Sequence, residues 1–255
     1  MLPSLGRKKL ADVTFTDCDA LHRKVSRTAP VQANRMVALL RKSFNLANRW
    51  GWMETNPAVG IRFNPEVKRE RYLTHAEIDR LLVALDAREG SASADLIRFL
   101  LLTGCRRGEA FNATWDQFDA DLSIWTKPAS TTKQRRLHRV PVSSAVSALL
   151  SRRREHAESQ VVFAGKTGGM LTDVKKTWRA VCHEAELDDV RLHDLRHTFA
   201  SLLVSNGQSL PTIGAMLGHS QTQTTARYAH LFDDTLAKAA EIVAGAVHRR
   251  QSETG

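Results

Sequence analysis

The stretch of residues 191–228 constrains the fold of this chain most, because glycines divide it into short segments of helical sequence. The first segment contains Arg-Leu-His-Asp-Leu-Arg-His and predicts a helix over residues 193–206, which Gly207 ends. The second segment predicts a short helix over residues 210–217, and Gly218 follows it directly. The spacing therefore predicts a group of short helices in this part of the chain, separated by sharp turns.

Reactive side chains are concentrated in the same stretch. His193 and Arg196 are three residues apart, so a helix places them on one face. His219 follows the second glycine break, and Tyr228 lies on the next helical segment, predicted over residues 222–231. An arginine, two histidines and a tyrosine that converge in a basic protein favour phosphoryl transfer without a metal.

The net charge of the chain indicates a polyanionic partner. The sequence has 37 Lys and Arg against 27 Asp and Glu, a formal net charge of +10 at pH 7, and nucleic acid is the commonest partner of such a protein. No apolar run reaches the roughly 18 residues of a membrane span, and the N-terminus has no signal-peptide core, so we expect a cytoplasmic protein without a membrane partner. Three scattered cysteines predict reduced thiols, with no disulfide and no zinc site: Cys18, Cys105 and Cys182.

The N-terminal part of the chain predicts helices. Residues 1–30 are polar and irregular, although Thr16-Asp17 could open a short helix. A longer helix is predicted from Ala29-Pro30 to Trp50-Gly51, with apolar residues on one stripe. Its other face carries four cations that are either solvated or in contact with DNA phosphates: Arg35, Arg41, Lys42 and Arg49.

The length of 255 residues allows one large domain or two modest ones. The charged segment 64–71 has no apolar periodicity, so we place the domain boundary there, between residues 1–65 and 66–255. Leu73-Thr74 begins the second domain with a predicted capping box to Glu77.

The second domain predicts more helix than strand. A buried helix is expected over 94–103, and short strands are expected at 124–125, 139–142 and 161–163. Further helices are predicted to follow Ser143 or Ser144 up to Glu155, and over 173–187 and 233–247. The helix 173–187 presents three candidate DNA contacts: Lys175, Lys176 and Arg179. The predicted fold class is therefore mainly α with a small antiparallel β-sheet.

Four motifs carry a resemblance to a known family. They are Thr103-Gly-Cys-Arg106-Arg-Gly-Glu109, His193-Asp-Leu-Arg196-His197, Leu217-Gly-His219 and Ala226-Arg-Tyr228-Ala-His230. In this order and spacing they resemble the tyrosine recombinases, the phage integrase family. The resemblance runs from about Leu5 to about Val247. It implies the tyrosine-recombinase catalytic fold, preceded here by a short, truncated helical core-binding domain.

The resemblance also implies a reaction and a set of catalytic residues. Tyr228 would attack a DNA phosphodiester to give a 3′-phosphotyrosyl protein and a free 5′-hydroxyl, with His193 as the candidate base. Arg106 and Arg196 would hold the non-bridging oxygens, with Glu109 orienting the arginine forks. His219 would donate another hydrogen bond, and Lys133 would be the general acid, with Lys127 as the fallback. Neither a metal nor a cofactor is implied.

The implied partners follow from the same resemblance. The family predicts double-stranded DNA as substrate and a homotetramer on two DNA sites, with accessory DNA-bending proteins as further candidates. The source would be a phage or another mobile element.

Several other interpretations remain open from the sequence. A host Xer-like recombinase that resolves chromosomes is the nearest of them. An inactive, truncated DNA-binding relative is another, and an unchanged phenotype of Tyr228→Phe would favour it. Type IB topoisomerases use similar chemistry. The spacing of His193 and His197 also occurs in zinc proteases, but Arg196 between the ligands would oppose a dication.

Overall fold

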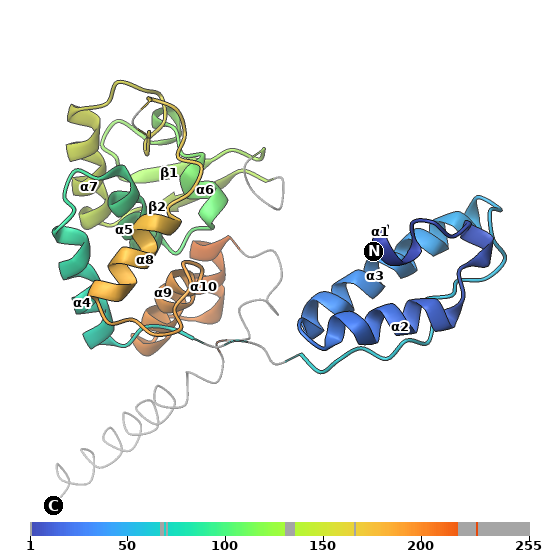
Figure 1. Cartoon of the computed structure of the whole chain (residues 1–255). Helices are drawn as coiled ribbons and strands as arrows, with labels where there is room; N and C mark the ends of the chain where they lie inside the picture. Colours follow the sequence, from blue (N-terminus) through green and yellow to red (C-terminus); the bar gives the residue numbers. More distant parts are fainter. Residues whose placement is uncertain are drawn as a thin grey trace, which may run out of the picture. The chain divides into compact units, whose positions relative to one another are not determined.

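The computed structural model divides into two compact units, Met1–Arg69 and Glu70–Gly255 (Figure 1). The boundary lies a few residues after the predicted division at 65/66. The structure describes residues 2–66, 69, 71–130, 136–165, 167–218 and 228. The helices predicted over 222–231 and 233–247 lie outside the described residues, apart from Tyr228.

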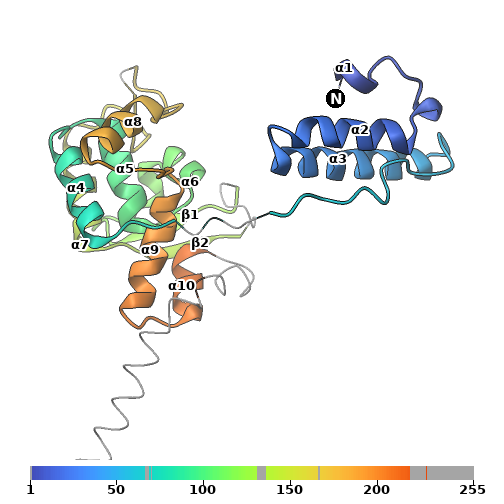
Figure 2. The same ribbon diagram turned by 60° about the horizontal axis from the view of Figure 1, so that its bottom comes forward.

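The first unit is built on a pair of helices that lie side by side, α2 (Phe15–Ser26) and α3 (Pro30–Arg49) (Figure 1, Figure 2). Two short helices precede them, α1 (Leu2–Leu5) and η1 (Leu10–Asp12). The predicted long helix is thus confirmed as α3.

The N-terminal segment is more regular than predicted, because the short helix expected at Thr16-Asp17 is present as α2 and covers 12 residues. Its start is fixed by a capping box. The Thr14 backbone N–H donates to Asp17 Oδ2 at 2.9 Å, and the Asp17 N–H donates to Thr14 Oγ1 at 3.3 Å. Cys18 and Leu21 then bury one face of α2 in a core shared with Phe44 of α3.

A polar cluster ties the segment after α3 back onto both helices. The Asn64 backbone N–H donates to Asn34 Oδ1 at 2.8 Å, and Asn34 Nδ2 donates to the Asn64 carbonyl at 2.9 Å. The Asn64 side chain also reaches Ser26 Oγ at 2.9 Å and His22 Nε2 at 3.2 Å. Because His22 and Asn34 are buried, these bonds satisfy polar groups that would otherwise destabilise the unit.

The second unit is mostly helical with a two-stranded antiparallel sheet, which confirms the predicted fold class. Its elements are α4 (His75–Asp86), α5 (Ala92–Thr103), α6 (Arg107–Phe111), η2 (Trp115–Gln117), β1 (Ile124–Lys127), β2 (His138–Pro141), α7 (Ser144–Glu155), α8 (Lys175–Glu184), α9 (Asp194–Ser205) and α10 (Leu210–Leu217).

Helix α5 is the centre of this unit, and it packs against α4, α7, α8 and α9 (Figure 1). Most of its residues are buried, on all sides of the helix. Phe99 of α5 makes an edge contact with Trp125 and a tilted contact with Phe163, each with ring centroids 5.1 Å apart. The first motif of the predicted site, which contains Arg106 and Glu109, lies at the C-terminal end of this buried helix.

The helix ends follow the predicted local signals. Thr74 caps α4 and exchanges hydrogen bonds with Glu77, and the Ser143 hydroxyl accepts from the Val146 N–H at the start of α7. Gly104 ends α5 with φ +59°, and a Cβ at that position would lie 2.4 Å from the Phe199 ring. Only glycine therefore allows α5 to end so close to α9.

The predicted third strand at 161–163 was wrong. Val161 forms only an isolated bridge with Thr114, where the Trp115 N–H donates to the Gln160 carbonyl at 3.0 Å. The Val162 N–H donates to the Ala113 carbonyl at 2.9 Å, and these two hydrogen bonds make up the single bridge, which does not extend into a ladder among the described residues. The sheet consists of β1 and β2, with Ile124 opposite Pro141 and Lys127 opposite His138.

In the described part of the chain, no helix combines the length and the apolar character needed to cross a membrane.

Candidate active site

Arg106 and Glu109 come together at the start of α6, directly after the turn at Gly104. Arg106 Nη1 donates to Glu109 Oε1 at 2.8 Å, and the Arg106 backbone N–H donates to Glu109 Oε2 at 3.3 Å. Arg106 Nη2 lies 3.4 Å from the Gly218 carbonyl at the end of α10. The Arg106 side chain is 27% exposed, whereas Glu109 is 2% exposed, so the carboxylate holds the guanidinium from the inside.

Lys127 of β1 makes a second, fully buried ion pair with the same carboxylate. Its Nζ donates to Glu109 Oε2 at 3.0 Å, and both side chains are 2% exposed. The ammonium also lies 4.4 Å from the centroid of the Trp125 ring. Burial alone would raise the pKa of Glu109, but the Lys127 charge and the hydrogen bonds from Arg106 and Lys127 outweigh it and lower that pKa.

This burial argues against Lys127 as the general acid, the fallback prediction. A general acid must reach the leaving oxygen within hydrogen-bond distance, directly or through one water. Lys127 instead directs its ammonium into the protein, toward Glu109. Lys133, the first prediction for that role, lies outside the described residues.

Arg196 joins three helices at the centre of the site. Its Nη1 donates to the Gly104 carbonyl at 2.8 Å, and its Nη2 donates to the Leu217 carbonyl at 2.9 Å. These carbonyls are at the C-terminal ends of α5 and α10, where helices leave acceptors unsatisfied and where a cation is stabilised. Burial, followed by the nearby charge of Arg106, lowers the pKa of Arg196. The two arginines thus converge on the same region from α6 and α9.

His138 of β2 packs the hairpin against the end of α10. Its Nε2–H donates to the Ala215 carbonyl at 2.7 Å. A Cβ on Gly218, whose φ is +64°, would lie 2.8 Å from the His138 ring. Burial, and then the Lys127 charge, lower the pKa of His138, which favours the neutral imidazole. The close approach fixes the Gly218 carbonyl near Arg106.

Tyr228 is buried against α9 and α10, and its hydroxyl contacts an imidazole that was not among the predicted site residues. Its oxygen lies 2.7 Å from His197 Nδ1. The whole residue is 5% exposed and packs with Val204, Ile213 and Leu217. His193, the predicted base, is exposed at the N-cap of α9, and its ring centroid lies 5.2 Å from that of His197.

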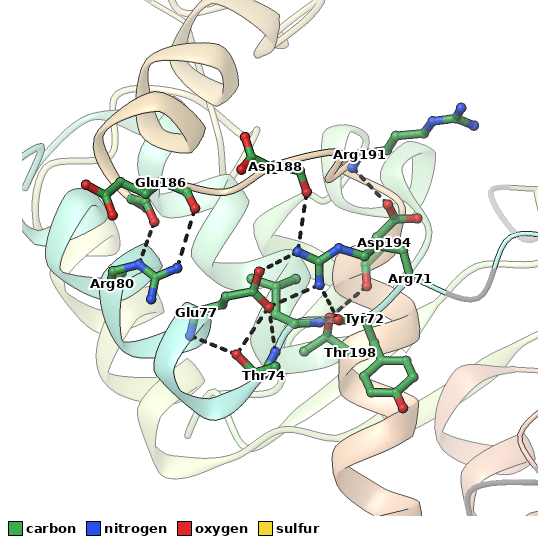
Figure 3. Close-up of polar contacts among 12 residues, drawn as sticks. Arg71, Tyr72, Thr74, Glu77, Arg80, Glu186, Asp188, Arg191, Asp194 and Thr198 are labelled. Carbon is green, nitrogen blue, oxygen red and sulfur yellow. Dashed lines mark hydrogen bonds and ion pairs between the residues drawn. The ribbon is translucent and has the colours of Figure 1, made fainter.

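The N-terminal end of α9 is fixed from two sides (Figure 3). The Arg191 N–H donates to Asp194 Oδ2 at 2.9 Å. Thr198 Oγ1 donates to the Asp194 carbonyl at 2.9 Å and accepts from the Leu73 N–H, also at 2.9 Å. In Figure 3 these bonds lie beside the Arg71–Glu77 ion pair at the start of α4. The loop that carries His193 is thereby tied to the first residues of the second unit.

The predicted DNA-contact residues fall into two groups. In the first unit, Lys42 and Arg49 are exposed and Arg35 pairs with Glu66 at 2.8 Å, whereas Arg41 donates to the Ala58 carbonyl at 2.9 Å and also bonds the Ile61 carbonyl. In the second unit, the three predicted cations of α8 are exposed: Lys175, Lys176 and Arg179.

Two further residues complete the description of the predicted elements. Arg153 of α7 is half-buried and donates to Asp95 Oδ2 at 2.8 Å. His219 lies outside the described residues.

The described residues hold no group of three or more His, Cys, Asp or Glu side chains arranged to bind a metal ion. The zinc-protease interpretation also conflicts with the contacts of one proposed ligand. His197 Nδ1 is engaged with the Tyr228 hydroxyl, and the side chain between the two histidines is the buried Arg196. The site instead combines the guanidinium groups of Arg106 and Arg196 with the phenol of Tyr228.

The fold around this site is that of the tyrosine-recombinase catalytic domain. A solved structure of a lambda integrase tetramer bound to a Holliday junction has a TM-score of 0.70 and 16% sequence identity, and the match covers 86% of this chain and 68% of that chain. At this identity the likeness concerns the fold alone.

Sequence comparison gives the family. Residues 71–235 match the family described as the phage integrase family, and this chain belongs to that family of tyrosine recombinases. The integrase of Escherichia phage 186 is 29% identical over 228 residues, which cover 88% of this chain and 63% of that protein. The tyrosine recombinase XerD of Lacticaseibacillus casei is 28% identical over 222 residues, 82% of this chain and 75% of that protein. The chain thus spans about three fifths of the phage integrase that it matches.

Proposed function

We propose that this protein is a site-specific DNA recombinase that cuts and rejoins strands through a tyrosyl intermediate. The observation that carries the proposal is the convergence of Arg106, Arg196 and Tyr228 at the ends of α5, α9 and α10. Two guanidinium groups match the non-bridging oxygens of a phosphodiester, and a phenol can form an ester with its phosphorus. Membership of the phage integrase family supports this assignment.

In the proposed reaction the Tyr228 hydroxyl attacks the phosphorus of a DNA phosphodiester. The product is a 3′-phosphotyrosyl protein and a free 5′-hydroxyl, and the 5′-hydroxyl of another strand reverses the step. The covalent bond conserves the energy of the broken one, so that no ATP is required. The two guanidinium groups and the lysine would supply the positive charge that a metal supplies in other enzymes. Arg106 and Arg196 stabilise the charge that develops on the phosphate, and such preorganised donors contribute about 3–4 kcal/mol each.

Four more residues belong to the proposed site. Lys133 would donate a proton to the leaving 5′-oxygen, and His219 would donate a hydrogen bond to the phosphate. His193 would take part in proton transfer from its exposed position at the start of α9. Glu109 would hold Arg106 in place through the contact at 2.8 Å.

The proposed partner is double-stranded DNA, bound by a homotetramer on two sites in the cytoplasm. The net charge of +10 supports a nucleic-acid partner, and the lambda integrase structure is a tetramer on a Holliday junction. Residues 1–65 would act as a short core-binding domain that contacts phosphates, and residues 66–255 would be the catalytic domain. DNA-bending proteins are candidate accessory partners.

The alternative function within the family is chromosome resolution of the Xer type. The match to Lacticaseibacillus casei XerD supports it, since that match covers 75% of the relative's length, against 63% for the phage 186 integrase. The target site separates the two functions. A phage or mobile-element integrase cuts at the end of its own element, whereas a chromosome-resolving enzyme cuts at a chromosomal site.

Covalent trapping tests the proposal. Nicked duplexes tiled from the DNA that flanks the gene are mixed with the protein, the mixture is denatured, and protein–DNA adducts are mapped. We expect an adduct at Tyr228 that is lost in Tyr228→Phe and retained in Tyr72→Phe. Tyr72 is the matched control because it is the only other tyrosine and is 36% exposed.

The outcomes are distinct. An adduct that survives Tyr228→Phe would contradict the assigned nucleophile. Salt-sensitive DNA binding without any adduct would favour a DNA-binding relative that does not cut. If chromosomal duplexes give an adduct and flanking duplexes do not, the chromosome-resolving function is favoured.

A further inference from the structure

We propose that His197 is a catalytic residue whose Nδ1 takes the proton of the Tyr228 hydroxyl as the tyrosine attacks. The proposal rests on the proposed function of Tyr228 as the nucleophile. It assigns the proton to a histidine other than His193, the histidine that the sequence pattern indicated. The contact that carries it is the 2.7 Å separation between His197 Nδ1 and the Tyr228 oxygen.

The surroundings of Tyr228 make a proton acceptor necessary. A phenol has a pKa of about 10 in water, so little of it is ionised at neutral pH. Tyr228 is 5% exposed and packs against apolar side chains of α9 and α10, including Ala200 and Ile213. An apolar surrounding disfavours a free phenolate further. The hydroxyl therefore reacts most readily when its proton moves to a base that is already in contact with it.

His197 is held well enough to serve as that base. It follows Arg196 in α9, and Arg196 is anchored by two hydrogen bonds, to the Gly104 and Leu217 carbonyls. The His197 and Tyr228 ring centroids are 5.9 Å apart with an interplanar angle of 55°, so the two groups meet at their polar edges. A fixed acceptor does not have to be oriented during the reaction.

The charges around the pair favour transfer in this direction. Arg196 interacts electrostatically with Tyr228, and a guanidinium nearby would stabilise the negative charge that develops on the phenol oxygen as its proton leaves. The His193 ring stands edge-on to His197, with an interplanar angle of 87°, and it is exposed at the N-cap of α9. An exposed imidazole beside the acceptor gives the proton a route to solvent. His193 would then be the second group in the path.

The step balances in atoms and charge. A lone pair of the Tyr228 oxygen forms the bond to phosphorus, and the bond from phosphorus to the 5′-oxygen breaks. The phenol proton moves to Nδ1 of a neutral His197, whose Nε2 carries the other hydrogen, and an imidazolium results. The leaving 5′-oxygen takes a proton from a lysine ammonium group that acts as the general acid, or from water.

The test uses His197→Asn in the full-length protein. The asparagine oxygen can accept a hydrogen bond close to the position of Nδ1, but a carboxamide is not a base at neutral pH. Single-turnover formation of the Tyr228 adduct is measured on the trapped nicked duplex between pH 6 and pH 10. The matched control is His183→Asn, since His183 is an exposed histidine of α8 outside the site.

We expect His197→Asn to form the adduct about 10²–10⁴-fold more slowly at pH 7, which is the usual contribution of general-base catalysis. The deficit should shrink as the pH rises toward about 10, because a growing fraction of the phenol is then ionised without help. His183→Asn should match the wild type throughout. A His197→Asn rate equal to the wild-type rate, or a deficit that stays constant with pH, would overturn the proposal, because a purely structural role predicts one of those results.

A second variant covers a folding defect of His197→Asn. In His197→Ala the lost ring leaves space beside the Tyr228 hydroxyl, and added imidazole should restore adduct formation in proportion to its neutral form. Absence of rescue in a folded, DNA-binding His197→Ala would count against the proposal. If the wild type forms no adduct at Tyr228, the proposed function fails, and this assignment fails with it. A wild-type adduct with an unimpaired His197→Asn refutes only the assignment.

Discussion

Lys127 Nζ and Glu109 Oε2 form an ion pair of 3.0 Å in which both side chains are 2% exposed. The other oxygen of Glu109 binds Arg106 at 2.8 Å, so a single carboxylate holds one cation of the candidate site and one cation of the sheet. Without Lys127, the Arg106–Glu109 pair would be neutral. With it, the group keeps a net positive charge near the place where a phosphate would bind.

Lys127→Met should destabilise the second unit by about 3–5 kcal/mol, because it leaves the buried Glu109 without one of its two cations. Denaturant unfolding of the full chain measures the loss. The double variant Lys127→Met with Glu109→Gln should recover part of it, since both fully buried charges are then removed and only the more exposed Arg106 loses its carboxylate. The exposed ion pair of Lys175 and Asp173 provides the control. The Lys175 side chain is 80% exposed, so Lys175→Met should lower the unfolding free energy by less than about 1 kcal/mol. Equal costs for the two lysines would refute the buried pairing.

Gly104→Ala should destabilise the protein by about 2–5 kcal/mol. The residue has φ +59°, which costs an L-residue about 1–2 kcal/mol, and its Cβ would lie 2.4 Å from Phe199, which adds about 1–3 kcal/mol of overpacking. Thermal unfolding checks this. Gly108→Ala is the matched control, because a Cβ there has no atom within 4 Å, and it should be neutral or stabilising by up to about 1 kcal/mol. If both variants unfold alike, the close approach of α5 and α9 is not the cause.

Arg196→Lys should slow adduct formation by about 10²–10³-fold while DNA binding stays near wild type. One ammonium cannot reproduce the fork that bonds the Gly104 and Leu217 carbonyls and still directs donors to a phosphate. The single-turnover adduct assay and an equilibrium binding assay, run on the same duplex, separate the two effects. A variant that loses binding and cleavage in parallel would indicate that Arg196 acts in assembly instead.

The Arg71–Glu77 pair at the start of α4 predicts a pH dependence of stability. The hydrogen bond from Arg71 is the largest of the causes that lower the pKa of Glu77 from 4.5 to about 2. A carboxyl with a lowered folded pKa adds stability above its unfolded pKa, and that stability is lost as the pH falls through the folded pKa. The difference in unfolding free energy between the wild type and Glu77→Gln should therefore be constant above about pH 4.5 and disappear toward pH 2. Glu158→Gln, at an exposed position, should show no such trend.

Much of the fold could be predicted because its signals are local. The capping box of Thr74 and Glu77, and the glycines that end α5 and α10, involve residues a few positions apart. The helix α2 had such a signal as well, in Thr14 and Asp17, although the sequence predicted only a short helix there. Val161–Phe163 had strand-like residues, yet a strand also needs a partner at the right register, and the Ala113 and Gln160 contacts provide only one bridge.

The candidate site was predictable to the extent that motif positions identify it, and less so in its contacts. Arg106 and Glu109 are three residues apart, so their contact follows from the helix start. The contact between His197 and Tyr228 spans 31 residues, and that between Lys127 and Glu109 spans 18. Such pairs depend on how α9, α10 and the sheet pack. Lys127 in particular has the sequence surroundings of a solvated hairpin lysine and is nevertheless fully buried.

Arg41 and Lys42 of α3 are neighbours that should behave differently. Arg41 bonds the Ala58 and Ile61 carbonyls and lies over the Phe63 ring, so Arg41→Ala should lower the stability of the first unit by about 1–3 kcal/mol. Lys42 is exposed, so Lys42→Ala should leave stability unchanged. If α3 lies on DNA phosphates, Lys42→Ala should also weaken DNA binding and reduce the slope of log affinity against log salt concentration by about 1. Unfolding curves and salt titrations of the two variants test this together. An Arg41→Ala variant with normal stability and a reduced salt slope would instead assign Arg41 to the DNA surface.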